Sequence, residues 1–422
     1  MTITTIKSRH IPNEWGLLNN FDVAEMALVE LINFMKGRMN MLYRKFGKTN
    51  EMVSILGFGC MRLPLLPGGD PSKIDEESST KLIRYAIDEG VNYIDTAYPY
   101  HGKGMGSGGQ SEPFVGKVLK NGYREKVKIA TKLPSWLIKT RADMDKYLNE
   151  QLERLETSTI DFYLVHALNS TLWKNVKEAG IAEFLDQAIR DGRIKHAGFS
   201  YHDTQENFNA IVDGYDWSFC QIQYNYLDEE FQAGRKGLDY AANKGLGLTI
   251  MEPLRGGKLA ANLPEEVQNA FNNANPKRTP AEWALRWVWD HPEVSLLLSG
   301  MNSMEQVVEN IKIAQTAIEN SFTCEESYVI EEVKNIYRQR IKVNCTACSY
   351  CMPCPSGVNI PGCFTFYNNY YMFGKEEMYH RMLQPEQRAS GCIECGQCET
   401  HCPQSIAIIE ELKNVKAIFE PA

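Results

Sequence analysis

Between residues 53 and 316 the chain alternates short apolar, β-rich runs with longer segments that are apolar at three- and four-residue spacing. The short runs are typical of buried parallel strands, and the longer segments are typical of amphipathic helices that pack on such strands. The pattern predicts eight strands, each followed by helical sequence: VSILGFG (53–59), VNYIDT (91–96), VKIATK (127–132), IDFYLVH (160–166), IKHAGFS (194–200), FCQIQYN (219–225), LGLTIME (246–252) and VSLLLSG (294–300).

Eight strand–helix units over roughly 260 residues predict an α/β fold of the (β/α)₈ TIM-barrel type, which we assign to residues 41–322. An open doubly wound sheet is the alternative, but no Gly-x-Gly-x-x-Gly follows the first strand. Residues 1–40 form an N-terminal extension with one helix-like stretch from Val23 to Met35. They are either a helical arm or sequence upstream of a true start at Met41. Residues 323–422 are expected to hold a linker helix over 324–341 and a separate cysteine-rich domain.

Polar residues close several of the apolar runs at equivalent positions. Asp95, Lys132, His166 and Ser200 lie at the ends of four successive expected strands. Any one of them could be a helix cap, a satisfied core group or a solvated side chain. In a TIM barrel, however, strand ends at the C-terminal face carry the chemistry, so four such residues together indicate a site.

At these positions the sequence closely resembles the aldo-keto reductases. The resemblance implies a catalytic tetrad at Asp95, Tyr100, Lys132 and His166, and a nicotinamide nucleotide that reduces a carbonyl or oxidises an alcohol. Tyr98, in the same string as Tyr100, is expected to be a loop or core aromatic. The matching strings cover nearly all of residues 52–316 in the family's order: ILGFGCMR, YIDTAYPYHG followed by SEPFVGKVL, KIATKLP, DFYLVHAL, IKHAGFS, QIQYN, MEPLRGG and SMEQVVENI.

The residue types of the tetrad suit carbonyl reduction. Hydride addition leaves negative charge on oxygen, and a free tyrosine with a pKa of about 10 donates its proton poorly. Lys132 is expected to lower the pKa of Tyr100, with Asp95 holding the lysine in an ion pair. His166 would orient the carbonyl and stabilise the developing oxyanion. The glycine-rich segment 102–109 that follows is expected to be either a mobile active-site loop or an inert insertion.

The nucleotide positions match the family less well. Tyr201 replaces the asparagine that usually follows the serine, Met251 replaces a stacking aromatic, and Asn302 stands where a basic residue often binds the 2′-phosphate of NADP. Arg255 and Lys258 are other basic candidates for that phosphate. The cofactor is therefore expected to be NADP(H) or NAD(H), with FMN as an alternative. The expected nucleotide contacts are Ser200, Gln221, Met251, Pro253, Leu254, Gly300, Asn302, Gln306 and Asn310.

Charge and hydropathy narrow the class of protein. The formal net charge is −8, and no block of basic residues occurs, which argues against a nucleic-acid or anionic-membrane surface. Neither an apolar run of spanning length nor an export signal is apparent, so a soluble cytoplasmic protein is expected. Nine of the 12 cysteines fall within residues 345–402, which indicates a metal or cluster module rather than a disulfide scaffold.

The cysteines form two runs, CTACSYCMPCP (345–355) and CIECGQCETHCP (392–403). The second has the C-x₂-C-x₂-C-x₃-C-P spacing of bacterial two-cluster ferredoxins, and the first is one residue shorter. Two structural zinc ions are the rival interpretation. Cys363 is expected to be a buried spare, or a substitute for Cys354. The crossed ferredoxin pattern assigns one [4Fe–4S] cluster to Cys345, Cys348, Cys351 and Cys402, and another to Cys354, Cys392, Cys395 and Cys398.

From Met41 onwards the chain resembles aldo-keto reductases that end in a ferredoxin-like dicluster domain. The main hypothesis is an oxidoreductase that acts on a small carbonyl or alcohol and carries two [4Fe–4S] clusters. The clusters would serve structure, or electron transfer to a redox partner protein. Two alternatives remain: a flavin- or cluster-based electron carrier that uses the barrel as a platform, and a non-catalytic redox sensor.

Overall fold

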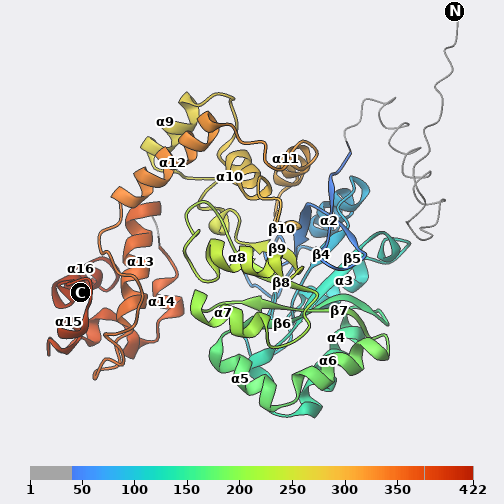
Figure 1. Cartoon of the computed structure of the whole chain (residues 1–422), viewed down its shortest axis with the longest axis horizontal. Coiled ribbons are helices and arrows are strands. Elements are labelled where there is room, and N and C mark those ends of the chain that lie inside the picture. The colour runs from blue at the N-terminus through green and yellow to red at the C-terminus, as the bar shows by residue number, and fades with distance from the viewer. Residues whose placement is uncertain (1–39, 375, 422) are drawn as a thin grey trace, which may run out of the picture.

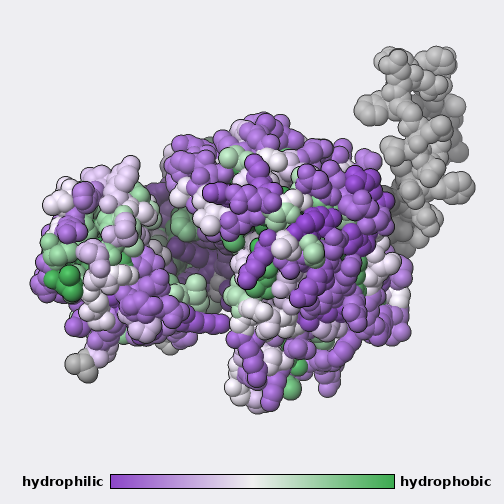
Figure 2. Space-filling view, turned by 90° about the horizontal axis from the view of Figure 1, so that it is seen from below, coloured by the Kyte–Doolittle hydropathy of each residue, from purple (hydrophilic) through white to green (hydrophobic). Residues whose placement is uncertain are grey.

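The computed structural model describes residues 40–374 and 376–421 (Figure 1). The helix expected from Val23 to Met35, like the rest of residues 1–39, lies outside the described residues. A barrel with surrounding helices forms one lobe, and the C-terminal helices form a second lobe beside it. Figure 2 shows a largely hydrophilic surface that is hollowed between the two lobes.

Eight parallel strands close the barrel in the order β10-β3-β4-β5-β6-β7-β8-β9. All eight strands expected from the apolar runs are confirmed, with ends that differ by a few residues. Their carboxyl ends lie at one face of the barrel, as the parallel pairing requires. The strands are β3 (Leu56–Gly59), β4 (Tyr93–Asp95), β5 (Lys128–Leu133), β6 (Ile160–Leu168), β7 (Ile194–Tyr201), β8 (Phe219–Gln223), β9 (Gly247–Met251) and β10 (Leu296–Ser299).

The run expected as one first strand is divided in two, which corrects the prediction for 53–59. Its beginning is β2 (Met52–Ser54), which pairs antiparallel with β1 (Tyr43–Lys45). Ile55 N–H then donates to Leu42 O at 3.0 Å, so the backbone is still bonded to the hairpin. Only from Leu56 does the chain join the barrel, as β3.

The β1–β2 hairpin closes the lower end of the barrel. Phe46 in its turn is fully buried, with its ring centroid 4.8 Å from that of Phe162 and 5.3 Å from that of Phe219. A Cβ added at Gly247 would lie 2.7 Å from the Phe46 ring, so glycine is required for this close approach. With this end filled by aromatic rings, the opposite end carries the open loops.

Helices surround the barrel because their apolar faces pack on the strands. Several begin at a side-chain cap: Asp75, Thr140 and Ser303 each accept a hydrogen bond from the backbone N–H three residues on. The helices of this lobe are α2 (Glu76–Asp88), α3 (Ser111–Val118), α4 (Arg141–Arg154), α5 (Ser170–Glu178), α6 (Ile181–Arg190), α7 (Gln205–Val212), α8 (Gly234–Asn243), α9 (Glu265–Asn273), α10 (Pro280–Trp289) and α11 (Met304–Ala314).

The helix expected over 324–341 is present as α12 (Cys324–Gln339), and it joins the two lobes. Its buried side chains Ile330, Val333 and Tyr337 pack with Phe271 of α9 and Trp283 of α10 in one apolar cluster. The C-terminal lobe has its own core, in which the ring of Tyr379 stacks on Phe419 with centroids 4.4 Å apart. Its helices are α13 (Ile360–Phe373), α14 (Tyr379–Met382), α15 (Gln397–His401) and α16 (Ile408–Phe419).

None of the described helices is both long enough and apolar enough to cross a lipid bilayer.

The contact made by α12 should contribute measurably to stability. Ile330→Ala removes a side chain that is 2% exposed, and it should lower the free energy of unfolding by about 2–5 kcal/mol through lost burial and the cavity left behind. Tyr328→Ala on the same helix, where the tyrosine is 75% exposed, is the matched control and should change it by less than about 0.5 kcal/mol. Urea denaturation of the full chain measures both, and equal midpoints would contradict the packing role of α12.

Candidate functional site

Four residues expected to be catalytic meet at the upper end of the barrel. Asp95 ends β4, Lys132 lies in β5, His166 lies in β6, and Tyr100 lies in the loop that follows β4. Lys132 Nζ is 3.4 Å from the Tyr100 hydroxyl, and the Tyr100 and His166 rings have centroids 6.2 Å apart. The structure thus brings together all four residues that the sequence predicted. Tyr98 points elsewhere, since its hydroxyl donates to Glu150 Oε1 at 3.2 Å.

Lys132 and Asp95 form a buried ion pair. Lys132 Nζ lies 2.8 and 2.7 Å from the two Asp95 carboxylate oxygens and 2.9 Å from Thr96 O. Their side chains are 0% and 3% exposed. Burial alone would lower the pKa of Lys132, but Asp95 and Tyr100 outweigh it and hold that pKa above its usual value. The lysine is therefore charged in the protein.

Tyr100 keeps its proton more firmly than the sequence predicted. Burial raises the pKa of its phenol, and the charge of Lys132 opposes this rise without cancelling it. Lys132 thus acts on this pKa in the expected direction, but the net pKa of Tyr100 lies above its usual value rather than below it. The main physical reason is burial, which disfavours a phenolate, and the nearby Asp95 carboxylate disfavours it further. At neutral pH the site presents a protonated phenol beside a cation.

His166 is neutral. Burial lowers the pKa of its imidazole far below the usual value, and the positive charge of Lys132 lowers it further. Its backbone is anchored because Ser135 Oγ donates to His166 O at 2.6 Å. Its Nδ1 is buried without a hydrogen-bond partner among the described residues. A neutral imidazole keeps one N–H to donate and one nitrogen to accept.

The glycine-rich segment 102–109 approaches this site. Trp136 Nε1–H donates to Met105 O at 2.8 Å, and the Trp136 ring lies 5.1 Å from the His166 ring. At the other end of the segment, Gly109 N–H donates to Tyr98 O at 2.7 Å. The segment therefore lies beside the site, where it is held by Trp136, which also contacts the expected catalytic histidine, and by Arg154, which donates to Gly109 O.

A buried polar network supports Lys132 from below. Gln151 Nε2 donates to Lys132 O at 3.0 Å and to Glu112 Oε1 at 2.6 Å. Glu112 is fully buried and also accepts from Thr131 Oγ1 at 2.6 Å and from Arg154 Nε at 2.8 Å. None of these supporting residues was predicted from the sequence. In the sequence, the one sign of this network is the carboxylate of Glu112 on the apolar face of a helix. Its role depends on hydrogen-bond partners that lie much further along the chain.

Three of the expected nucleotide contacts lie on adjacent strand ends. Ser200 of β7 and Gln221 of β8 are register partners, and Gln221 Nε2 lies 3.5 Å from Met251 Sδ of β9. The Ser200 hydroxyl accepts from Ala167 N–H at 2.7 Å, which leaves its own hydrogen free to donate. Gln221 Oε1 is buried and lacks a hydrogen-bond partner among the described residues. An amide N–H₂ group of a ligand would satisfy that oxygen.

Tyr201, at the position of the usual asparagine, belongs to the barrel wall rather than to the mouth. It is fully buried, its ring lies 4.9 Å from that of Phe208 in α7, and its hydroxyl donates to Thr204 O. Ser200 and Gln221 are therefore left as the polar groups of this part of the mouth.

The remaining expected contacts lie on the loops after β9 and β10 and on α11, the helix that follows the second loop. Pro253 and Leu254 lie in the turn after β9, where Pro253 is buried. Gly300 and Asn302 are exposed after β10, and Asn302 N–H donates to Gln306 Oε1 at 2.9 Å. Asn310 is buried and donates to Ser299 Oγ at 3.0 Å, which makes it a structural group of this loop.

Three basic side chains near these loops have different roles. Arg62, just after β3, packs its aliphatic carbons about 3.3 Å from where a Cβ at Gly300 would lie, and its guanidinium is 3.4 Å from Glu252 Oε1. It lies in the string ILGFGCMR, but its role was not predicted. Arg255 and Lys258 instead face the C-terminal lobe.

Lys258 Nζ lies 2.8 Å from Glu376 Oε2, and the Arg255 guanidinium lies 5.0 Å from the centre of the Phe373 ring. Arg255 also donates to Asn369 Oδ1 at 3.4 Å. Both cations are therefore engaged with α13 and the segment after it.

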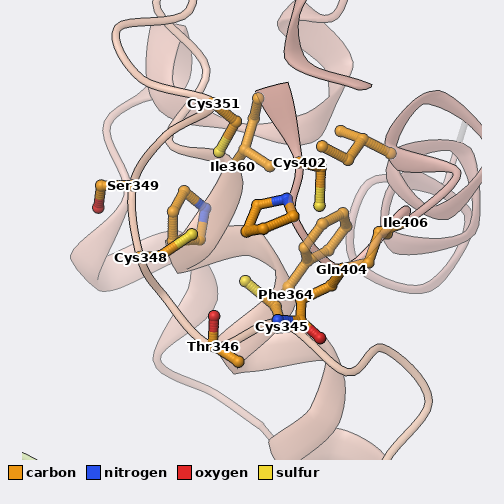
Figure 3. A pocket seen from close by; sticks show the side chains of 13 residues that line it. Cys345, Thr346, Cys348, Ser349, Cys351, Ile360, Phe364, Cys402, Gln404 and Ile406 are labelled. Carbon is orange, nitrogen blue, oxygen red and sulfur yellow. The ribbon is translucent and has the colours of Figure 1, made fainter. Parts of the chain in front are cut away.

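In the C-terminal lobe, eight cysteines line two cavities in the crossed arrangement predicted from their spacing. The first cavity, about 330 Å³, is lined by Cys345, Cys348, Cys351 and Cys402 (Figure 3). The second, about 300 Å³, is lined by Cys354, Cys392, Cys395 and Cys398. Ile360, at the start of α13, lines both cavities and so forms a wall between them. The other walls of the first cavity are mainly apolar, including Phe364 and Ile408.

The donor set of each cavity fits an iron–sulfur cubane. Cysteine thiolates are the ligands of [4Fe–4S] clusters, and three closely spaced cysteines with a fourth from a remote run are typical of such clusters. Within the described ranges, no three His, Cys, Asp or Glu side chains converge closely enough to hold one metal ion. Cys363 lines neither cavity. It is buried, its sulfur lies 3.7 Å from Gln387 O, and burial raises the pKa of its thiol to about 12.

Comparison with known proteins agrees with this geometry. The aldo/keto reductase family matches residues 55–325, and the 4Fe-4S dicluster domain matches residues 344–407. A 6-dehydroglucose reductase of Novosphingobium aromaticivorans is 26% identical over 281 residues, which cover 63% of this chain and 88% of that protein. The aldo-keto reductase YhdN of Bacillus subtilis is 27% identical over 307 residues, which cover 63% of this chain and 87% of that protein.

A solved structure shares the barrel. The holo form of aldo-keto reductase AKR11C1 from Bacillus halodurans is 25% identical, with a TM-score of 0.56, and the match covers 70% of this chain and 96% of that one. These relatives match the barrel lobe of the chain. The match to the family itself covers residues 55–325, which is more than half of the sequence. The chain therefore belongs to the aldo/keto reductase family, with a 4Fe-4S dicluster domain following its barrel.

Proposed function

We propose that this oxidoreductase reduces a small carbonyl compound, or oxidises the corresponding alcohol, with a nicotinamide nucleotide bound at the upper end of the barrel. The observation that carries the proposal is the buried Lys132–Asp95 pair, whose ammonium lies 3.4 Å from the Tyr100 hydroxyl. A cation held next to a protonated phenol at the mouth of a barrel is suited to proton donation to oxygen.

The protonation states of the side chains at the site support carbonyl reduction at neutral pH. A reduced nicotinamide supplies the hydride when it is bound, and the chain has to supply the proton. Tyr100 holds that proton because burial raises its pKa. Lys132 stabilises the phenolate that remains after donation, and Asp95 keeps the ammonium in place. Oxidation of an alcohol would need the opposite state, in which Tyr100 has lost its proton.

His166 would bind the carbonyl oxygen. Its neutral ring can donate one N–H to oxygen without competing with Tyr100 as an acid. The nearby Trp136 ring, 5.1 Å away, excludes water from one side of the imidazole. In this arrangement His166 positions the substrate and stabilises the charge that develops on its oxygen.

The strand ends beside the tetrad support the nicotinamide. Gln221 Oε1 lacks a partner among the described residues, and the Ser200 hydroxyl has a free hydrogen, so the pair can accept from and donate to one carboxamide. Met251 would contact the ring with its thioether in place of an aromatic side chain. Arg62 is the basic group that adjoins the loop of Gly300, and it would face the phosphates of the nucleotide.

We further propose that the eight cavity cysteines bind two [4Fe–4S] clusters, which exchange electrons singly. Two structural zinc ions are disfavoured because each cavity takes three closely spaced cysteines and a remote fourth, whereas zinc modules usually present separated C-x₂-C pairs. The clusters would lie near the start of α13, whereas its last residues contact the β9 loop of the barrel. A helix of 14 residues spans about 20 Å, so the two centres are well separated.

This separation supports hydride chemistry in the barrel and a different electron partner for the clusters. Transfer between a two-electron and a one-electron centre also calls for a mediator such as a flavin. Anaerobic mixing with NADPH or NADH, followed by low-temperature EPR, decides the point. Reduced clusters without added flavin would exclude the separated arrangement, and a yellow chromophore released on denaturation would favour the flavin alternative.

The same proposal includes the domain division and the location. Residues 41–322 would form the catalytic domain and residues 323–422 the linker helix with the cluster domain. None of the 12 cysteines forms a disulfide, as is usual in a reducing compartment, and we place the protein in the cytoplasm.

The role of Tyr100 can be tested directly. Tyr100→Phe removes the proton donor with little change in volume, so turnover with a panel of carbonyl substrates should fall by about 10²–10⁴-fold while nucleotide binding persists. Because the protonated phenol is needed and its pKa lies above 10.0, wild-type reduction should be lost only above about pH 10. Tyr98→Phe is the matched control. A damaging Tyr98→Phe with a silent Tyr100→Phe would exclude this assignment.

Nucleotide choice should follow from Asn302. Because this exposed side chain is uncharged, the protein should discriminate weakly between NADP and NAD. Asn302→Arg should tighten NADP binding by about 1–3 kcal/mol through a charge-assisted contact with the 2′-phosphate, and should leave NAD binding nearly unchanged. Isothermal titration measures both affinities. A wild-type protein that already binds NADP far more tightly than NAD would show that another cation, with Arg62 the first candidate, reads the phosphate.

Metal analysis tests the cluster assignment. Protein purified without oxygen should be brown, with about eight iron and eight acid-labile sulfide per chain. Cys354→Ala should lower the iron content and alter the EPR spectrum of one cluster, whereas Cys363→Ala should leave both unchanged, since Cys363 lines neither cavity. Colourless protein with about two zinc ions per chain would establish structural metal sites instead.

A further inference from the structure

The two cysteine cavities differ in the hydrogen bonds that reach their sulfurs. At the second cavity, Ser356 Oγ lies 3.3 Å from Cys354 Sγ. The Ser356 hydroxyl is thus directed at one of the four cysteines that line this cavity.

The serine that lines the first cavity does not hydrogen-bond to a cysteine sulfur. Ser349 lines this cavity, but its hydroxyl lies 3.3 Å from Ala347 O, to which it donates. Cys345 Sγ accepts one backbone N–H, that of Ala347, at 3.4 Å. Among the described residues, Ser356 carries the only side-chain hydroxyl within hydrogen-bond distance of any of the eight cavity sulfurs.

The direction of the Ser356 hydrogen bond follows from the chemistry of the site. A cysteine that binds iron is a thiolate and has no proton, so the serine hydroxyl must donate to the sulfur. Donation withdraws negative charge from the sulfur. A cluster that has taken up one electron carries more negative charge on its sulfurs, so the hydrogen bond is stronger in the reduced form than in the oxidised one. Hydrogen bonds to the sulfurs are among the factors that set the potential of a cluster.

We propose that Ser356 raises the reduction potential of the cluster bound by Cys354, Cys392, Cys395 and Cys398 relative to that of its neighbour. Ile360 lines both cavities, so an electron can be shared across one side chain. When the two clusters together hold one added electron, Ser356 therefore favours its location on the second cluster. This inference rests on the proposed [4Fe–4S] occupancy, and it makes Ser356 a positioning residue that acts through Cys354.

The test is an anaerobic redox titration of the full chain with dithionite and mediators, followed by low-temperature EPR. In Ser356→Ala the midpoint of one cluster should move to a more negative potential, while that of the other stays at its wild-type value. Ser349→Ala is the matched control at the first cavity and should leave both midpoints unchanged. Unchanged midpoints in Ser356→Ala, or equal shifts of both, would overturn the proposal.

A second pair of variants guards against disturbance of the turn. Ser356→Thr keeps a hydroxyl, and Ser356→Val has nearly the same shape without one. The Thr variant should titrate close to the wild type, and the Val variant should show the negative shift of one cluster. Equal midpoints in the two would overturn the role of the hydroxyl. If the cavities do not hold [4Fe–4S] clusters, the outcome is distinguishable from these results, because the wild-type protein would then contain zinc and give no titratable cluster signal.

Discussion

The positive charge of Lys132 governs the arrangement of the barrel mouth. An ammonium group with no exposed surface is costly unless each of its N–H groups has a partner. Asp95 balances its charge, while Thr96 O and the Tyr100 hydroxyl occupy the remaining directions. Loss of Asp95 would leave an unpaired buried charge, at a cost of about 3–5 kcal/mol. The same constraint brings Tyr100 next to a cation, and this contact suits the phenol to proton donation.

The barrel and the cluster domain meet at the loop after β9. This loop continues from Met251, an expected nucleotide contact, to Arg255 and Lys258, which hold Phe373 and Glu376. A family loop expected to serve the nucleotide therefore also anchors α13.

The cluster domain solves a different physical problem. Eight sulfurs have to be held around two spaces without collapse, and apolar side chains such as Ile360 and Phe364 fill the surroundings. Each cavity takes three cysteines from one run and one from the other, so neither run completes a site alone. The core that joins α13 to α16, with Tyr379 stacked on Phe419, brings the runs together.

The sequence alone determined the features that depend on local periodicity and short spacing. It predicted the eight strands, the linker helix, the polar residues that end four of the strands and the division of eight cysteines into two sets, because buried strands are apolar runs and most ligands of each set are closely spaced. Tyr100, which lies in a loop, was expected from the family resemblance. Predictions from the sequence failed where contacts with residues distant in the chain decide the structure or the pKa. Ile55 stays bonded to Leu42 in the hairpin, and burial outweighs Lys132 in the pKa of Tyr100. Only tertiary structure decides such contacts, because the energy of a buried polar group depends on which atoms surround it.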